Sequence, residues 1–193
     1  MSQIGFYFDQ TRCTGCNTCS VSCKDWYNID AGPVNLMRVK VIERGKFPEL
    51  FAAHLACPCY HCSDPVCVKA CPEQAITRRD SDCIVVVDRE KCTGKEECPK
   101  KCLKACPYDA PQFGPEADAK MVKCDLCSGR VAEGKKPICV EACPMMAIDV
   151  GPLDELKTRY AGSQEAEGFK YSKTCKPAAF FKPKTCTLKE CSR

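Results

Sequence analysis

The sequence predicts an α+β fold in which short strands and short helices surround metal-binding loops. Three observations lead to this prediction. The chain has 193 residues and contains 21 cysteines. Sixteen of these cysteines fall into four motifs of similar spacing. The segments that flank the motifs also resemble one another, which indicates that a small supersecondary unit has been duplicated.

Short strands are expected where β-branched or aromatic residues lie between turn signals, at 5–9, 36–43, 74–78, 83–88 and 147–150. Short helices are expected at 17–24, 65–70, 100–105, 138–142 and 153–160. Residues 161–193 are expected to form an irregular tail that wraps the body, anchored by Ala179-Phe180-Phe181. The large apolar core of an ordinary domain is expected to be missing, because so much of the chain is metal-binding loop. We therefore predict that the metal-free chain does not fold.

The four motifs have related spacings. They are Cys13-x2-Cys16-x2-Cys19-x3-Cys23, Cys59-x2-Cys62-x4-Cys67-x3-Cys71, Cys92-x5-Cys98-x3-Cys102-x3-Cys106, and Cys124-x2-Cys127-x11-Cys139-x3-Cys143. The last three motifs are each followed directly by proline, and an alanine comes three residues after that proline. Asp9 and Asp88 each precede a motif by four residues, after a β-rich run. We expect these aspartates to cap loop N–H groups.

These spacings favour cubane iron–sulfur clusters over the alternatives. A loop with three closely spaced cysteines wraps three corners of a [4Fe–4S] core, and a cysteine followed by proline ligates the other cluster of a pair. A zinc-stabilised interaction module is the alternative of a different class, since structural zinc sites also use Cys-x2-Cys. A zinc site does not need a cysteine that ligates the second centre of a pair. A disulfide scaffold fits poorly, because the count of 21 is odd and residues 1–6 show no export signal.

Charge and hydropathy give no support to nucleic-acid binding or to a membrane span. The formal charge of +4 becomes about −4 when four oxidised clusters, each about −2 with its thiolates, are counted. The basic residues therefore give no argument for nucleic-acid binding. No run of 18 apolar residues occurs, so we expect no membrane span. Without an export signal, the cytoplasm is the expected location by default.

The order of the motifs resembles that of the iron–sulfur subunits of DMSO-reductase-type molybdenum and tungsten oxidoreductases. The resemblance covers residues 5–182 and is sharpest at 59–67, 105–114 and 123–127. It implies two nested ferredoxin-like dicluster units with four [4Fe–4S] clusters. The outer unit would comprise 1–56 and 115–160, the inserted inner unit 57–114, and the tail 161–193.

The resemblance also implies how the cysteines pair, the first motif with the fourth and the second with the third. Carried over to this sequence, it gives cluster A: Cys13, Cys16, Cys19 and Cys143; cluster B: Cys124, Cys127, Cys139 and Cys23; cluster C: Cys59, Cys62, Cys67 and Cys106; cluster D: Cys92, Cys98, Cys102 and Cys71. The third motif is stretched, and Lys95 stands where a cysteine often would. Four cysteines remain there, so a full cubane is still expected at cluster D.

The other candidate residues are few. His61 lies between two ligands and is a candidate donor to a cluster sulfur, with a position at the surface or beside the ligands without redox significance as the alternative. His54 is expected to pack. Trp26 and Tyr27 follow Cys23 and are expected to pack, or to shield cluster B or face a partner. Five cysteines are left outside the motifs: Cys57, Cys83, Cys175, Cys186 and Cys191. Cys57 competes with Cys59 for one ligand position, and the register favours Cys59. Cys83 fits a small core residue, and a fifth metal site in the tail remains an alternative.

No catalytic constellation and no G-x-G-x-x-G dinucleotide motif is present, so the protein is not expected to be an enzyme by itself. The resemblance implies an electron-transfer subunit that connects a molybdopterin-containing catalytic subunit with a second redox partner. That second partner would be a membrane quinone-reactive subunit or another electron carrier. A polyferredoxin linked to hydrogenase or CO dehydrogenase, or a partner of the tungsten aldehyde-oxidoreductase type, are the alternatives. The resembled family also includes complexes that a twin-arginine partner exports.

Overall fold

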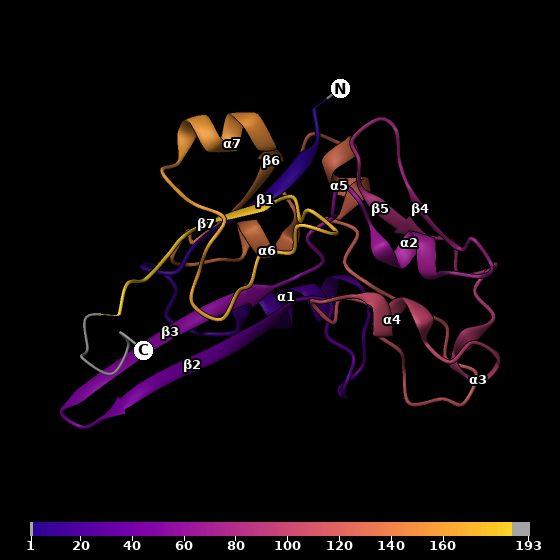
Figure 1. Ribbon diagram of the computed structural model, residues 1–193, viewed down its shortest axis with the longest axis horizontal. Helices are drawn as coiled ribbons and strands as arrows, with labels where there is room; N and C mark the ends of the chain where they lie inside the picture. The colour runs from indigo at the N-terminus through magenta and orange to yellow at the C-terminus, as the bar shows by residue number, and fades with distance from the viewer. Residues whose placement is uncertain (1, 187–193) are drawn as a thin grey trace.

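The computed structural model describes residues 2–186, and these form seven strands and seven helices (Figure 1). The strands are β1 (Ile4–Asp9), β2 (Arg38–Lys46), β3 (Glu49–Cys57), β4 (Ile76–Arg78), β5 (Val85–Val87), β6 (Ile148–Pro152) and β7 (Ala179–Lys182). The helices are α1 (Thr18–Trp26), α2 (Val66–Ala70), α3 (Gly94–Glu97), α4 (Lys101–Ala105), α5 (Ser128–Ala132), α6 (Ile138–Glu141) and α7 (Leu153–Arg159). The mixed content confirms the predicted α+β class. Within these residues no helix is long and apolar enough to cross a bilayer.

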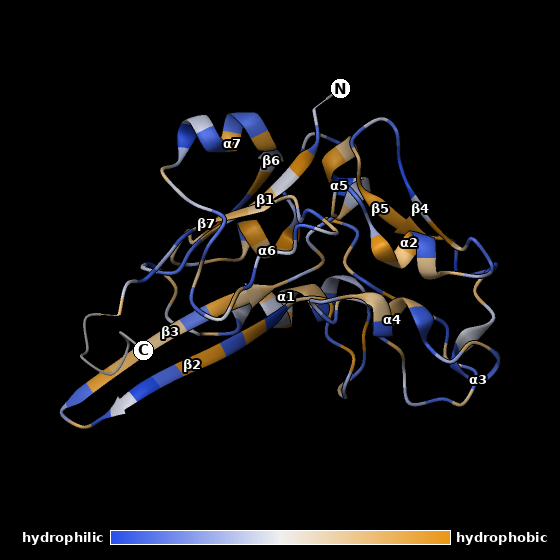
Figure 2. Ribbon diagram, in the orientation of Figure 1, coloured by the Kyte–Doolittle hydropathy of each residue, from blue (hydrophilic) through white to orange (hydrophobic). Residues whose placement is uncertain are grey.

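The strands form one three-stranded sheet and two hairpins. The sheet has the order β6-β1-β7, with β1 antiparallel to β6 and parallel to β7. Strands β4 and β5 pair antiparallel, with Ile76 opposite Val87. The β2–β3 pair is a long hairpin that projects from the body of the molecule in Figure 1. Figure 2 shows hydrophilic and hydrophobic residues alternating along β2, as expected for a strand that is not enclosed on both faces.

Four of the helices associate in two pairs, α1 with α6 and α2 with α4. We call β1, β6, α1 and α6 the outer half, and β4, β5, α2 and α4 the inner half. Each half thus has two antiparallel strands and two short helices. Gln112 pairs with Val122 through two backbone hydrogen bonds of 2.7 and 2.9 Å, which join the segment after α4 to the segment before α5.

All five expected strands and all five expected helices occur, with bounds shifted by a few residues. The sequence analysis missed β3 because its alanine-rich run has weak β-propensity, and full pairing with β2 supplies what propensity does not. It also missed α3 and α5, which are single helical turns within ligand loops.

The prediction of an irregular tail was wrong for residues 179–182, which form β7 and extend the outer sheet. The expected anchor is confirmed, since Phe181 is fully buried and Phe180 is 3% exposed. Ala178 donates its N–H to Tyr60 O at 2.9 Å, so the segment before β7 also holds the start of the second motif.

The apolar core is larger than the sequence analysis expected. Phe6, Phe8, Leu55, Ile148 and Phe181 lie in one continuous core that extends to several cysteines. The inner half has a much smaller core of Ile76, Val85, Cys102 and Met121. The expectation of a missing core was therefore wrong for the outer half. The sheet and tail bring together aromatic residues that are far apart in the sequence.

Candidate metal centre

Three small cavities are each lined by four cysteines that come from two different motifs. The first is lined by Cys13, Cys16, Cys19 and Cys143. The second is lined by Cys59, Cys62, Cys67 and Cys106. The third is lined by Cys71, Cys92, Cys98 and Cys102. We refer to these sets as quartets A, C and D, because they have the same members as the sets that the family resemblance implies.

The remaining motif cysteines, Cys23, Cys124, Cys127 and Cys139, also lie close to one another and are called quartet B. Burial first, and then the neighbouring Cys127, raise the pKa of Cys23 to about 12. Burial and then Cys124, Cys127 and Cys23 raise the pKa of Cys139 well above its ordinary value. The mutual effect of these cysteines shows that they are close enough to act as ligands of one centre, whose positive charge would favour their thiolate forms.

Four short helices determine which cysteines meet. Each helix has a cysteine of one quartet near its start and a cysteine of another quartet four residues later: Cys19 and Cys23 at α1, Cys67 and Cys71 at α2, Cys102 and Cys106 at α4, Cys139 and Cys143 at α6. Four residues span about 6 Å along a helix. Quartets A and B are thus joined by α1 and α6, and quartets C and D by α2 and α4.

Backbone N–H groups in the ligand loops point at cysteine sulfurs. Ala147 N lies 3.3 Å from Cys143 Sγ, Leu126 N lies 3.4 Å from Cys124 Sγ, and Met121 N lies 3.5 Å from Cys92 Sγ. Such donors stabilise negative charge on thiolate sulfur and raise the reduction potential of a cluster bound there. The cavities, the converging cysteines and these donors fit [4Fe–4S] clusters, which would supply one-electron transfer when bound.

The arrangement gives no support to the zinc alternative. Among residues 2–186 no group of three or more His, Cys, Asp or Glu side chains is close enough together to hold a single metal ion. A tetrahedral zinc ion needs four sulfurs at about 2.3 Å from one point. In quartets A, C and D the four cysteines line a cavity between them, as the ligands of a polynuclear core do.

The two aspartates before the ligand loops have the predicted capping role. Asp9 Oδ1 accepts hydrogen bonds from Thr11 N at 2.9 Å and Thr11 Oγ1 at 2.6 Å. Asp88 Oδ1 accepts from the N–H groups of Glu90 at 3.0 Å and Lys91 at 3.3 Å. Both carboxylates fix the chain direction just before the first cysteine of a motif.

The histidines behave differently from each other. His54 lies against Gly15, where an added Cβ would be 2.3 Å from His54 Nε2, and Gly15 has a φ of +73°. Only glycine fits this turn of the first ligand loop, so His54 packs as predicted. His61 is 1% exposed, and its Nδ1 accepts the N–H of Val85 at 3.0 Å. Burial lowers the pKa of His61 well below its ordinary value, so the ring is neutral. Its Nε2 has no hydrogen-bond partner within the described part of the molecule.

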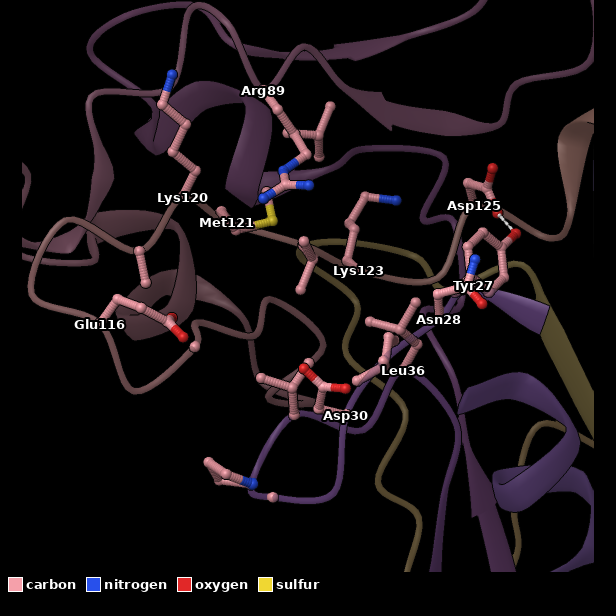
Figure 3. A pocket seen from close by; sticks show the side chains of 18 of the residues that line it. Tyr27, Asn28, Asp30, Leu36, Arg89, Glu116, Lys120, Met121, Lys123 and Asp125 are labelled. Atoms are coloured by element: carbon pink, nitrogen blue, oxygen red, sulfur yellow. Dashed lines mark hydrogen bonds between the residues drawn. The ribbon is translucent and has the colours of Figure 1, made fainter. Parts of the chain in front are cut away.

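Of the two aromatic residues expected to pack, Trp26 lies largely at the surface, and Tyr27 packs beside the fourth ligand loop. Trp26 is 48% exposed, and the Arg130 guanidinium lies 4.7 Å from the centre of its ring. Tyr27 donates its hydroxyl hydrogen to Asp125, as drawn in Figure 3. Asp125 in turn accepts the N–H of Cys127 at 2.9 Å. Tyr27 thus supports the fourth ligand loop through Asp125.

The stretched third motif is held by Lys95 rather than by another cysteine. Lys95 Nζ donates to Gly114 O at 2.8 Å and to Pro115 O at 3.0 Å. These bonds pin the loop that carries Cys98 against the segment after the inner half. Four cysteines still line the cavity of quartet D.

The leftover cysteines fall into several environments. Cys57 donates to Leu55 O at 3.4 Å and does not line the cavity of quartet C, whereas Cys59 does. Cys83 is buried, as expected of a small core residue. Cys175 is fully buried, and its charge is the second cause, after burial, that raises the pKa of Cys62. Cys186 is disulfide-bonded, and Cys191 lies outside the described residues.

Sequence reasoning missed the functional interest of three residues: Lys123, Asp125 and Cys175. The first two adjoin Cys124 in the sharpest part of the resemblance, so their position was a usable signal. Cys175 offered none, because its place beside Cys62 depends on the tail. There Ser63 N donates to Lys176 O at 2.8 Å and Asp64 N donates to Cys175 O at 3.1 Å.

Comparison with known proteins agrees with this geometry. Residues 50–153 match the model of the 4Fe-4S dicluster domain. This protein belongs to the 4Fe-4S dicluster family. It is 42% identical over 190 residues to a component of the anaerobic dimethyl sulfoxide reductase of Escherichia coli K12, covering 94% of this sequence and 89% of that protein. It is an iron–sulfur subunit of the DMSO-reductase-type oxidoreductase group and is not catalytic alone.

Two more distant relatives widen the group. A component of the sulfite dehydrogenase of Allochromatium vinosum is 34% identical over 175 residues, which are 80% of this sequence and 71% of that protein. The formate dehydrogenase-O iron-sulfur subunit of Escherichia coli K12 is 33% identical over 173 residues, which are 81% of this sequence and 55% of that protein. Members of this 4Fe-4S dicluster family thus occur in oxidoreductases with different substrates.

Proposed function

We propose that this protein binds four [4Fe–4S] clusters through quartets A to D and relays electrons between a molybdopterin-containing catalytic subunit and a second redox partner. The observation that carries the proposal is the convergence of motif cysteines on separate cavities, each lined by four sulfurs. This function requires no substrate site, because the protein would bind the redox centres and fix their positions relative to one another.

The helices support one linear order of the four centres. Clusters A and B would be neighbours through α1 and α6, and clusters C and D through α2 and α4. Clusters B and C would meet across the two halves, since negative charge on Cys59 is the second cause, after burial, that raises the Cys124 pKa. The order A-B-C-D therefore places A and D at the two ends, where partners would exchange electrons.

The nested arrangement of two dicluster units remains part of the proposal. The equivalent pairs of helices and antiparallel strands in the outer and inner halves support it. So does the position of the inner half in the sequence, between α1 and α6.

The class of partner is proposed from the relatives, whose names are those of dimethyl sulfoxide reductase, sulfite dehydrogenase and formate dehydrogenase components. We propose a molybdenum- or tungsten-pterin catalytic subunit at one end. A membrane quinone-reactive subunit, or another electron carrier, would be at the other. The location of the complex would then follow that of the catalytic subunit.

The test is anaerobic purification of the complex through a tag on this protein, followed by metal and pterin analysis. We expect a co-purifying subunit with molybdenum or tungsten and pterin. Its substrate should reoxidise or reduce the iron–sulfur centres of the tagged protein. A partner that contains nickel and no pterin would contradict the proposal and favour a hydrogenase- or CO-dehydrogenase-linked polyferredoxin.

A further inference from the structure

Lys123 is a nearly buried cation at the junction of the two halves. The residue is 7% exposed. Its Nζ donates to Cys124 O at 2.8 Å and, through a second short hydrogen bond, to Val85 O in strand β5. Within residues 2–186 Lys123 forms no salt bridge with a carboxylate. Two carbonyl groups do not neutralise an ammonium, and an unpaired buried charge is costly.

The negative charge that Lys123 lacks lies on both sides of it. Lys123 itself lines the cavity of quartet C, together with Cys59 and Cys67. In the sequence it directly precedes Cys124, a member of quartet B. It thus adjoins one cysteine set of the inner half and one of the outer half.

We infer that Lys123 provides a fixed positive charge between clusters B and C and thereby raises the reduction potentials of both. This inference rests on the proposed function, because it requires clusters in quartets B and C. Uptake of one electron makes a cluster more negative by one charge, and a nearby cation in a poorly hydrated interior favours that reduced form. Lys123 would make the middle of the series of centres a favourable place for the electron to pass.

A purely structural role is the competing explanation. The two hydrogen bonds of Lys123 tie β5 of the inner half to the fourth ligand loop, and such a tie works without any effect on potentials. Substitutions that keep or remove the positive charge distinguish the two roles. Arginine keeps the charge at this site, glutamine keeps a hydrogen-bond donor without charge, and methionine keeps an unbranched side chain with neither.

The experiment is a redox titration of the anaerobic holoprotein monitored by electron paramagnetic resonance. Lys123→Met is expected to lower the midpoint potentials of two of the four clusters, each by about a tenfold change in the reduction equilibrium, which is 59 mV for one electron. Lys123→Gln is expected to do the same, and it replaces Lys123→Met if that variant does not assemble. Lys123→Arg is expected to keep both potentials near the wild-type values.

Lys120 supplies a matched control. It lines the same groove as Lys123 but is exposed, and in Figure 3 it points away from Lys123 and Asp125. Lys120→Met is therefore expected to leave all four potentials unchanged.

The outcome separates this inference from the proposed function. If Lys123→Gln contains a full complement of iron and all four potentials match those of wild type, Lys123 is only a structural tie. A shift equal to that of Lys120→Met would overturn the inference in the same way. Wild-type protein with iron for fewer than four clusters would instead count against the proposed function itself.

Discussion

The outer and inner halves carry equivalent cysteine helices, yet different forces hold those helices. In the outer half a three-stranded sheet and a continuous aromatic core support α1 and α6. In the inner half a two-stranded hairpin with three residues in each strand supports α2 and α4, over a core of four buried residues. The comparison teaches that the same ligand geometry can rest on apolar packing in one half and must rest on metal–thiolate bonds in the other.

Removing the iron is expected to have the largest effect and to separate the two halves. The inner half should lose its structure, because its small core cannot replace the bonds to metal. The outer sheet should keep part of its protection from amide hydrogen exchange. Hydrogen exchange read by mass spectrometry, with and without anaerobic chelation, measures this. Equal residual protection in β1 and β5 of the metal-free protein would break the comparison.

Substitution of equivalent ligands in the two halves sharpens the comparison between them. Cys19→Ala and Cys67→Ala each remove the first-turn ligand of a helix, in the outer and inner half respectively. Bound iron should fall by up to about four atoms per molecule in either variant. The melting temperature of the holoprotein should fall further for Cys67→Ala, since less packing remains around its site. A larger fall for Cys19→Ala would show that the outer half depends on metal as much as the inner half.

Substitution in the aromatic core tests how much apolar packing stabilises the outer half. Phe181 is fully buried in β7, so Phe181→Ala should cost about 3–5 kcal/mol in the free energy of unfolding. Denaturant unfolding of the holoprotein measures that cost. Phe47→Ala is the matched control, because Phe47 is 93% exposed at the hairpin tip, and it should cost less than about 0.5 kcal/mol. Similar costs for the two variants would refute a structural role for the tail strand.

The smallest expected effect concerns the extra cysteine beside quartet C. Cys175→Ala should leave the iron content unchanged, because quartet C already supplies four sulfurs. It should cost about 1–2 kcal/mol, since Cys175 is fully buried. Cys83→Ala serves as a control away from Cys62. A loss of iron in Cys175→Ala alone would make Cys175 a ligand.

Local patterns predicted much of this molecule from the sequence. The capping by Asp9 and Asp88 and the helices at Cys19 and Cys102 depend on residues within a few positions, so spacing was enough. The α+β class and the family followed from motifs. The grouping of the cysteines came from the family resemblance and not from the spacings, which do not say which motifs meet.

The features that sequence reasoning missed all depend on distant contacts. Strand β7 forms because Phe181 pairs beside Phe8 across most of the sequence. Cys175 reaches Cys62 only because the tail returns to the second motif. Lys123 becomes a junction residue because β5 supplies the carbonyl of Val85. Hydrophobic periodicity and secondary-structure propensity carry no information about such pairings.

Iron and acid-labile sulfide in the anaerobically purified protein test the central claim most directly. Sixteen cysteines in quartets A to D predict about sixteen iron atoms and about sixteen sulfide ions per molecule, with no zinc. A folded, colourless protein that contains zinc, or one that holds about eight iron atoms at full occupancy, would contradict the account.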